Sequence, residues 1–204
     1  MKGMRKAVIS LLLLTGLAGC GEPKELDMPE YLEYMEQAEA PYKKHVKTGN
    51  LEYTVQYANP EYMVSRQFAE QADTISASVV TNRLQEIGKH IFFLIRIQES
   101  GGKTKTIQER MEDNGKAEAM NMYYQFEAAR DITMIADGAE YKPVTYLFEN
   151  NYALTPYNTI VAGFERVDGV AEVQIVFNDK YHNVPLIKAS YSKDELNALP
   201  KLIF

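Results

Sequence analysis

The chain has 204 residues with a formal net charge of −6, and it contains one cysteine, 14 tyrosines, 8 phenylalanines and no tryptophan. The acidic balance and the lack of a basic stripe argue against a nucleic-acid partner, because phosphate binding requires clustered lysine and arginine side chains. A single thiol excludes an internal disulfide, so the fold must be stabilised by its core alone, and the tyrosine-rich composition favours strands.

The first twenty residues have the features of an export signal. Lys2, Arg5 and Lys6 precede an apolar stretch at residues 7–18, which is shorter than the ~20 residues that a membrane-spanning helix requires. The stretch runs into Leu17-Ala18-Gly19-Cys20. This combination resembles the signal peptide and lipobox of bacterial lipoproteins; the alternative is an ordinary secretory signal with a chance cysteine. The resemblance implies lipidation of Cys20 and removal of residues 1–19, and it carries no information about the domain that follows.

Lipidation of Cys20 would fix the location of the protein. Loss of the three basic residues with the signal takes the net charge from −6 to −9, so an anionic membrane surface would repel the chain and the acyl groups must anchor it. Residues 20–27 form a polar tether that reaches only about 25 Å at ~3.3 Å per residue. We therefore predict a lipid-anchored protein of the bacterial cell envelope. Gly21 rather than aspartate follows the cysteine, which by the lipoprotein sorting rule implies the outer membrane if the host has two membranes.

Residues 28–204 are predicted to form a single globular domain whose first half mixes helices and strands. Capping residues and apolar periodicity predict a helix at 28–38, with Asp27 as its N-cap and Pro29 in its first turn. They also predict a strand at 51–57, a helix after Asn59-Pro60 and a central strand at 91–97 that is buried on both faces. Residues 74–87 fit either a helix or a strand, and we favour a helix closed by Gly88.

The second half is predicted to be rich in strands, which we place at 120–128, 132–136, 141–148, 159–166, 172–177 and 184–191. Residues 107–118 are weakly helical or loop, with Asn114-Gly115 as a turn signal. Asp137-Gly138 and Asp168-Gly169 lie between consecutive strands and supply the positive φ angles of tight hairpins.

A last short helix is predicted at 193–198, because Ser192 and Glu195 have the spacing of a capping box. Six short strands with tight turns predict an α+β fold that is mainly β: an antiparallel β-sandwich, Ig-like or Greek-key, with N-terminal helices.

Two charge clusters have alternative interpretations. Glutamates 30, 33, 36 and 39 share one side of the first helix and could dock a basic partner or divalent ions, although a solvated face is the simpler interpretation. The basic group Lys43, Lys44, His45 and Lys47 is interpreted as a solvated turn rather than a polyanion site.

The sequence offers little catalytic chemistry. His45, His90 and His182 have no metal-ligand spacing, no Gly-x-Ser-x-Gly elbow occurs, and His182 is expected to be an exposed turn residue. Carboxylate pairs such as Glu127 and Asp131 are uninformative among 28 acidic residues. Met120-x-Met122 on a strand could bind Cu(I), but core packing is the simpler interpretation. We therefore predict no enzyme activity, no cofactor and no metal site.

Tyrosines are the remaining candidates for ligand binding, because they combine a stacking face with a polar group. Tyr146, Tyr152 and Tyr157 lie in or beside a loop, where binding residues concentrate. The sequence thus predicts a lipid-anchored, non-enzymatic interaction or scaffold module of an envelope assembly, with a protein partner and the membrane contacted through Cys20. The alternative is a lipoprotein that binds a glycan or small ligand through these tyrosines, and an envelope hydrolase is the least favoured.

Overall fold

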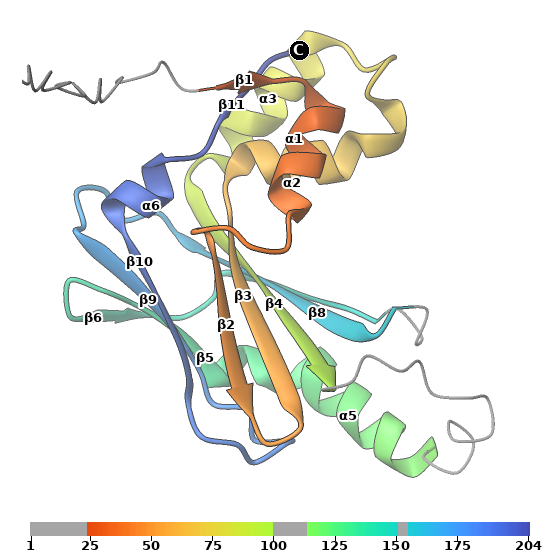
Figure 1. The fold of residues 1–204 in the computed structure, drawn as a ribbon, viewed down its shortest axis with the longest axis vertical. Helices are drawn as coiled ribbons and strands as arrows, with labels where there is room; N and C mark the ends of the chain where they lie inside the picture. The colour runs from red at the N-terminus through yellow and green to blue at the C-terminus, as the bar shows by residue number, and fades with distance from the viewer. Residues whose placement is uncertain (1–23, 100–113, 151–154) are drawn as a thin grey trace, which may run out of the picture.

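The computed structural model describes residues 24–99, 114–150 and 155–204. It shows two antiparallel sheets packed face to face, with helices covering one end of the larger sheet (Figure 1). The predicted α+β class, an antiparallel sandwich with N-terminal helices, is confirmed.

The first half of the chain forms β1 (Glu25–Leu26), α1 (Met28–Glu36), β2 (Lys43–Thr48), β3 (Leu51–Ala58), α2 (Pro60–Phe68), a 3₁₀ turn (Ala69–Gln71), α3 (Ala77–Ile87) and β4 (His90–Glu99). Both predicted helix starts are confirmed, because the Asp27 carboxylate accepts the Glu30 backbone N–H at 2.9 Å and the Asn59 side chain accepts that of Tyr62 at 3.1 Å. The helix favoured at 74–87 is also confirmed as α3, which ends at Gly88.

The second half forms α5 (Asn114–Phe126), a 3₁₀ turn (Ala128–Asp131), β5 (Ile132–Ala136), β6 (Ala139–Tyr141), β7 (Thr145–Glu149), β8 (Tyr157–Glu165), β9 (Glu172–Phe177), β10 (Ile187–Ser192), α6 (Lys193–Asn197) and β11 (Lys201–Leu202). The predicted capping box of α6 is present, since Ser192 and Glu195 exchange hydrogen bonds between side chain and backbone.

The predicted strand at 120–128 is wrong, because most of it belongs to α5. Asn114-Gly115 begins this helix instead of forming a turn. The residues that follow, Lys-Ala-Glu-Ala-Met at 116–120, are all strong helix formers. Tyr123 and Tyr124, adjacent in sequence, are both buried, which a strand open on one face would not allow.

Two other details of the strand prediction also differ. The predicted strand at 141–148 is divided between the sheets: β6 pairs with β5 and β7 pairs with β8, and Pro143, which has no N–H to donate, lies between them. Asp137-Gly138 forms the predicted β5–β6 hairpin with φ angles of 48° and 80°. Asp168-Gly169 does not form a hairpin, because β8 and β9 belong to different sheets.

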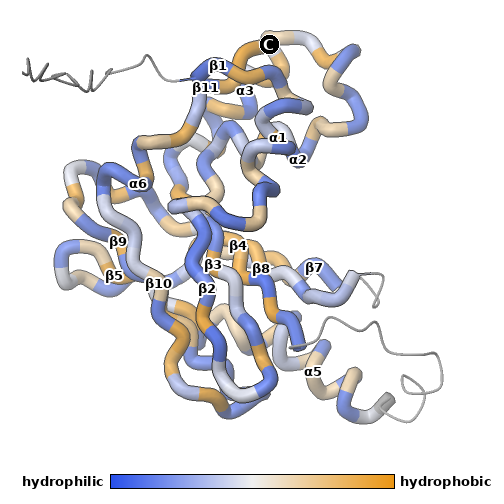
Figure 2. The backbone as a smooth tube through the Cα atoms, viewed as in Figure 1, coloured by the Kyte–Doolittle hydropathy of each residue, from blue (hydrophilic) through white to orange (hydrophobic). Residues whose placement is uncertain are grey.

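The sandwich core lies between a five-stranded sheet of order β2-β3-β4-β8-β7 and a four-stranded sheet of order β10-β9-β5-β6. β4 is central, as predicted, and pairs with β3 and β8. The rings of Phe93 and Tyr191 meet across the two sheets at 5.3 Å, and the Tyr191 hydroxyl donates to the Val55 carbonyl oxygen at 2.6 Å. Figure 2 shows hydrophobic segments along β4 and β8, whereas α6 is hydrophilic.

The opposite face of the five-stranded sheet is covered at one end by α1, α2 and α3 (Figure 1). Tyr31, Met35 and Tyr62 are completely buried there. β1 pairs in parallel with β11 at the same end, so the first and last strands within the described residues are hydrogen-bonded to each other. Part of the predicted tether at 20–27 is therefore a strand.

The two charge clusters behave differently from each other. The basic group predicted to be a turn is strand β2, and Lys43 is buried with its ammonium group bonded to the Gln37 carbonyl oxygen. Of the glutamates on α1, Glu36 forms an ion pair with Arg96, whose Nη2 donates to both carboxylate oxygens at 2.8 and 3.0 Å. Glutamates 30, 33 and 39 are exposed, which agrees with a solvated face.

Candidate functional site

The predicted tyrosine site is not assembled by the residues that the structure describes. Tyr146 on β7 pairs with Ala162, whereas Tyr157 lies five residues away on β8. Side chains alternate along a strand, so the two tyrosines project from opposite faces of the sheet. Tyr146 donates to the Tyr124 carbonyl oxygen beneath α5, and Tyr157 lies under the Arg96 guanidinium. Tyr152 lies outside the described residues.

A different group of side chains converges at the end of the sandwich opposite β1, where α5 and the loop between β9 and β10 lie (Figure 1). The Asp179 carboxylate of that loop is completely buried. Its Oδ2 accepts hydrogen bonds from the Tyr53 and Tyr124 hydroxyls, both at 2.7 Å, and contacts His182 Nδ1 at 2.9 Å. Its Oδ1 accepts the His182 backbone N–H at 3.2 Å. One carboxylate thus connects β3, α5 and the β9–β10 loop.

The electrostatics of this cluster favour an ionised aspartate among neutral tyrosines. Burial alone would raise the pKa of Asp179, but hydrogen bonds from His182, Tyr124 and Tyr53 outweigh it and hold the pKa below its ordinary value. Burial, reinforced by the Asp179 charge, raises the pKa of Tyr124 well above its ordinary value. Burial and the neighbouring Asp179 carboxylate also raise the pKa of the Tyr53 hydroxyl above its ordinary value. The hydroxyls therefore remain protonated donors.

His182 differs from its prediction as an exposed turn residue, because its side chain is only 21% exposed and is held by Asp179. Its Nδ1 also lies 2.9 Å from the Tyr124 hydroxyl. A carboxylate that orients an imidazole is found in catalytic dyads. Within the described residues, however, no serine or threonine hydroxyl is bonded to this imidazole, and the contacts of the pair are those of a polar core that fixes a loop.

A pocket of about 280 Å³ lies beside this cluster, and we call it the distal pocket. Its walls combine aromatic rings with both signs of charge, from Tyr123, Glu127, Arg130, Asp131, Lys180 and Tyr181. The rings of Tyr123 and Tyr181 lie 6.3 Å apart and 25° from parallel. The Tyr123 hydroxyl donates to Asp131 at 3.0 Å, and Lys180 pairs with the same carboxylate at 2.5 Å.

The outer side of α5 exposes an apolar surface. Met122 and Phe126, four residues apart, lie on the same side of the helix and are 54% and 64% exposed. Met120 is partly buried against the core, in agreement with the packing interpretation, but Met122 is not. The two thioethers therefore do not face the same way, as they would on a strand.

The Asp179 cluster was not found from the sequence. Its members come from three segments separated by 55 and more residues, and no local spacing connects them. The only local signal was Asp179 three residues before His182, a spacing that also occurs in ordinary loops.

Neither metal ligands nor a membrane span is found within the described ranges. Across 24–99, 114–150 and 155–204, no three histidine, cysteine or acidic side chains are grouped so that they could hold a metal ion. Over the same ranges, no helix combines the length and the apolar character needed to cross a membrane.

Comparison with known proteins identifies no family: no family model and no curated protein matches the sequence. Among solved structures, a DUF4426 family protein from Pseudomonas aeruginosa PAO1 aligns with a TM-score of 0.34 and 9% identity, covering 74% of this chain and 93% of that one. A conserved domain protein from Bacillus anthracis aligns with a TM-score of 0.32 and 8% identity, covering 74% of this chain and 48% of that one.

Proposed function

We propose that this protein is a lipid-anchored, non-enzymatic module of the bacterial cell envelope that contacts a protein partner through the outer side of α5. The lipobox at residues 17–20 supports the anchor. In a diderm host, Gly21 supports sorting to the outer membrane. The proposed partner is an envelope protein that presents an apolar surface.

The position of β1 supports an orientation for this module. Five residue steps separate Cys20 from Glu25, the first residue of β1, and at ~3.4 Å per residue they span at most about 17 Å. A lipid on Cys20 would therefore keep the end with β1, β11 and the helices near the bilayer. α5 lies at the opposite end (Figure 1) and would face away from the membrane.

The observation that carries the proposal is the exposure of Met122 and Phe126. Large apolar side chains that lie together on a helix and remain outside the core are typical of helix docking surfaces. Burial of the two side chains against a partner would contribute about 3 kcal/mol, at ~1.5 kcal/mol for each half-buried side chain. Aromatic residues and methionine are also enriched at interfaces.

Site-specific photocrosslinking in whole cells tests this proposal. A photoreactive phenylalanine analogue at position 126 is expected to form one discrete adduct with an envelope protein. The same analogue at Val79 on α3, which is 46% exposed at the other end of the molecule, is the matched control and should not form it. Met122→Ser should weaken the adduct at position 126 several-fold. The absence of an adduct, or the same adduct from both positions, would contradict the proposal.

A second function, glycan binding, is favoured by the nearly parallel rings of Tyr123 and Tyr181 in the distal pocket. Sugars stack on tyrosine faces and bond to carboxylates such as Asp131 and Glu127. If this pocket binds glycans, a soluble oligomer of N-acetylhexosamine should bind, and Tyr181→Ala should weaken binding about tenfold, corresponding to ~1.4 kcal/mol. Tyr157→Ala, which alters a tyrosine on the far face, serves as the control. Unchanged affinity in Tyr181→Ala would exclude this function.

A further inference from the structure

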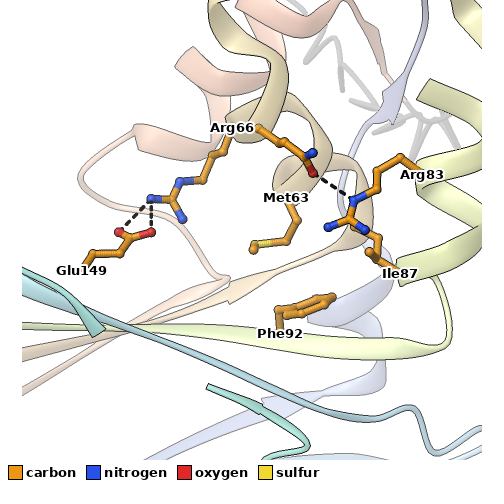
Figure 3. Close-up of a pocket in the computed structure, with 7 residues that line it drawn as sticks. Met63, Arg66, Arg83, Ile87, Phe92 and Glu149 are labelled. Atoms are coloured by element: carbon orange, nitrogen blue, oxygen red, sulfur yellow. Dashed lines mark hydrogen bonds and ion pairs between the residues drawn. The ribbon is translucent and has the colours of Figure 1, made fainter. Parts of the chain in front are cut away.

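A second pocket, of about 260 Å³, lies between α2, α3 and the face of the five-stranded sheet that the helices cover (Figure 3). Its apolar lining comes from Met63 on α2, Ile87 on α3 and Phe92 on β4. Gly163 on β8 makes this floor possible, because a Cβ atom there would lie only 2.7 Å from the Phe92 ring. We call it the arginine pocket after its two cationic residues.

Arg66 and Arg83 flank the arginine pocket from α2 and α3, with Met63 between them and Phe92 beneath (Figure 3). Arg66 uses only Nη2 to hold Glu149, at 3.0 and 3.1 Å. Arg83 uses Nε to reach Gln67 at 2.9 Å and Nη1 to reach Glu86 at 2.6 Å. Within the described part of the chain, Nη1 of Arg66 and Nη2 of Arg83 have no hydrogen-bond partner.

The lining of the pocket holds more positive than negative groups. It contains two guanidinium groups and the Glu149 carboxylate, whereas Glu86, the carboxylate partner of Arg83, lies outside the lining. The arginine side chains are 27% and 34% exposed, so they are partly removed from water, whereas Glu86 is 65% exposed and is well solvated. The remaining Nη group of each arginine can donate a charge-assisted hydrogen bond to a carboxylate oxygen. A phosphate monoester, which carries a charge of about −1.5 to −2, would exceed the available charge.

We propose that the arginine pocket binds a small amphiphilic carboxylate, with the carboxylate between Arg83 and Arg66 and the apolar part against Phe92 and Met63. At about 30 Å³ for each non-hydrogen atom, the cavity holds about nine such atoms, which matches the nine carbon atoms of 3-phenylpropionate with its carboxylate oxygens at the arginines. Pockets of this kind combine an apolar lining with a few polar groups that fix the orientation. This site lies away from α5 and the distal pocket, and the proposal is independent of the function proposed for them.

Titration of the purified full-length protein with 3-phenylpropionate, followed by NMR of the methionine and isoleucine methyl groups, tests this site. The Met63 and Ile87 signals are expected to shift with saturation. The neutral analogue 3-phenylpropan-1-ol should bind at least tenfold more weakly, because it lacks the charge. Octanoate in a parallel titration separates the two sources of such a ligand: tighter binding than 3-phenylpropionate supports an acyl chain from the membrane, and weaker binding supports a soluble aromatic acid.

Arg83→Gln is the decisive variant, because it removes one cation from a surface helix without touching the Arg66–Glu149 pair. It should weaken 3-phenylpropionate binding about tenfold, and Arg130→Gln, a matched change in the distal pocket, should leave binding unchanged. Equal affinity for the acid and the alcohol, no loss in Arg83→Gln, or shifts confined to residues outside the pocket would each overturn the proposal. None of these results would affect the crosslinking test at α5.

Discussion

Asp179→Asn is expected to lower the free energy of unfolding by about 3 kcal/mol, the cost of disrupting a buried charged network by removing one partner. The amide has nearly the same volume as the carboxylate, so no cavity forms. What changes is the charge that three donors share: the Tyr53 and Tyr124 hydroxyls at 2.7 Å and His182 Nδ1 at 2.9 Å. The amide NH₂ group must also meet one of these donors or the His182 backbone N–H. Urea unfolding followed by far-UV circular dichroism measures the difference.

The pH dependence of the same difference tests its electrostatic origin. The pKa of Asp179 is lower in the folded protein than the ~3.9 of an unfolded chain. A group with a lowered folded pKa contributes stability that is present above its unfolded pKa and is lost as the pH falls through the folded pKa. The difference in free energy of unfolding between the native protein and Asp179→Asn should thus be constant above about pH 5 and become smaller at lower pH.

Asp168→Asn is the matched control, since Asp168 is exposed in the β8–β9 connection. Its effect should be within about 0.5 kcal/mol at any pH, as is usual for surface substitutions. If Asp179→Asn were as mild as this control, the buried cluster would not hold the β9–β10 loop in place.

Cys20→Ala is expected to abolish lipidation completely. Without the thiol no thioether can form, so labelled palmitate should not be incorporated and the chain should keep the mass of the precursor. Folding should be unaffected, because the first described strand begins at Glu25 and Cys20 precedes it. Palmitate labelling checks the loss of lipidation, mass spectrometry checks the retained precursor mass, and thermal unfolding of the purified variant checks that the domain folds normally.

Gly21→Asp is the control for this experiment, because it alters the residue beside the cysteine and retains the thiol. Palmitate incorporation should continue, and in a diderm host only the sorting between the two membranes should change. Continued palmitate labelling of Cys20→Ala would show that the lipobox interpretation is wrong.

Local signals predicted those parts of the fold in which neighbouring residues decide the structure. Asp27 and Asn59 cap helices because a side-chain oxygen can reach the unpaired backbone N–H groups of the next turn whatever else surrounds it. The run at 91–97 predicted a buried central strand because a strand with sheet neighbours on both sides and layers on both faces requires apolar residues at nearly every position.

α5 shows where such signals conflict. Tyr123, Tyr124 and Phe126 favour strands, and Met122, Tyr124 and Phe126 also fit a period of two. The α5 positions that pack against the core, Met120, Tyr123 and Tyr124, are instead spaced by three and four residues, as on a helix. Which period dominates depends on what packs against the segment, and here it is the Asp179 loop and the sheet residue Phe148.

The α+β class and the helix caps were predictable from the sequence, and the proposed export signal, with Cys20 as its acylation candidate, rests on the sequence alone, because each depends on residues within a few positions of one another. Tertiary packing, by contrast, gathers Tyr53, Tyr124 and His182 around Asp179 and places Arg66 and Arg83 beside one pocket. It also separated Tyr146 from Tyr157, since strand register sets the face from which each side chain projects. These groupings join segments far apart in the chain, and the packing of two sheets and a layer of helices brings them together.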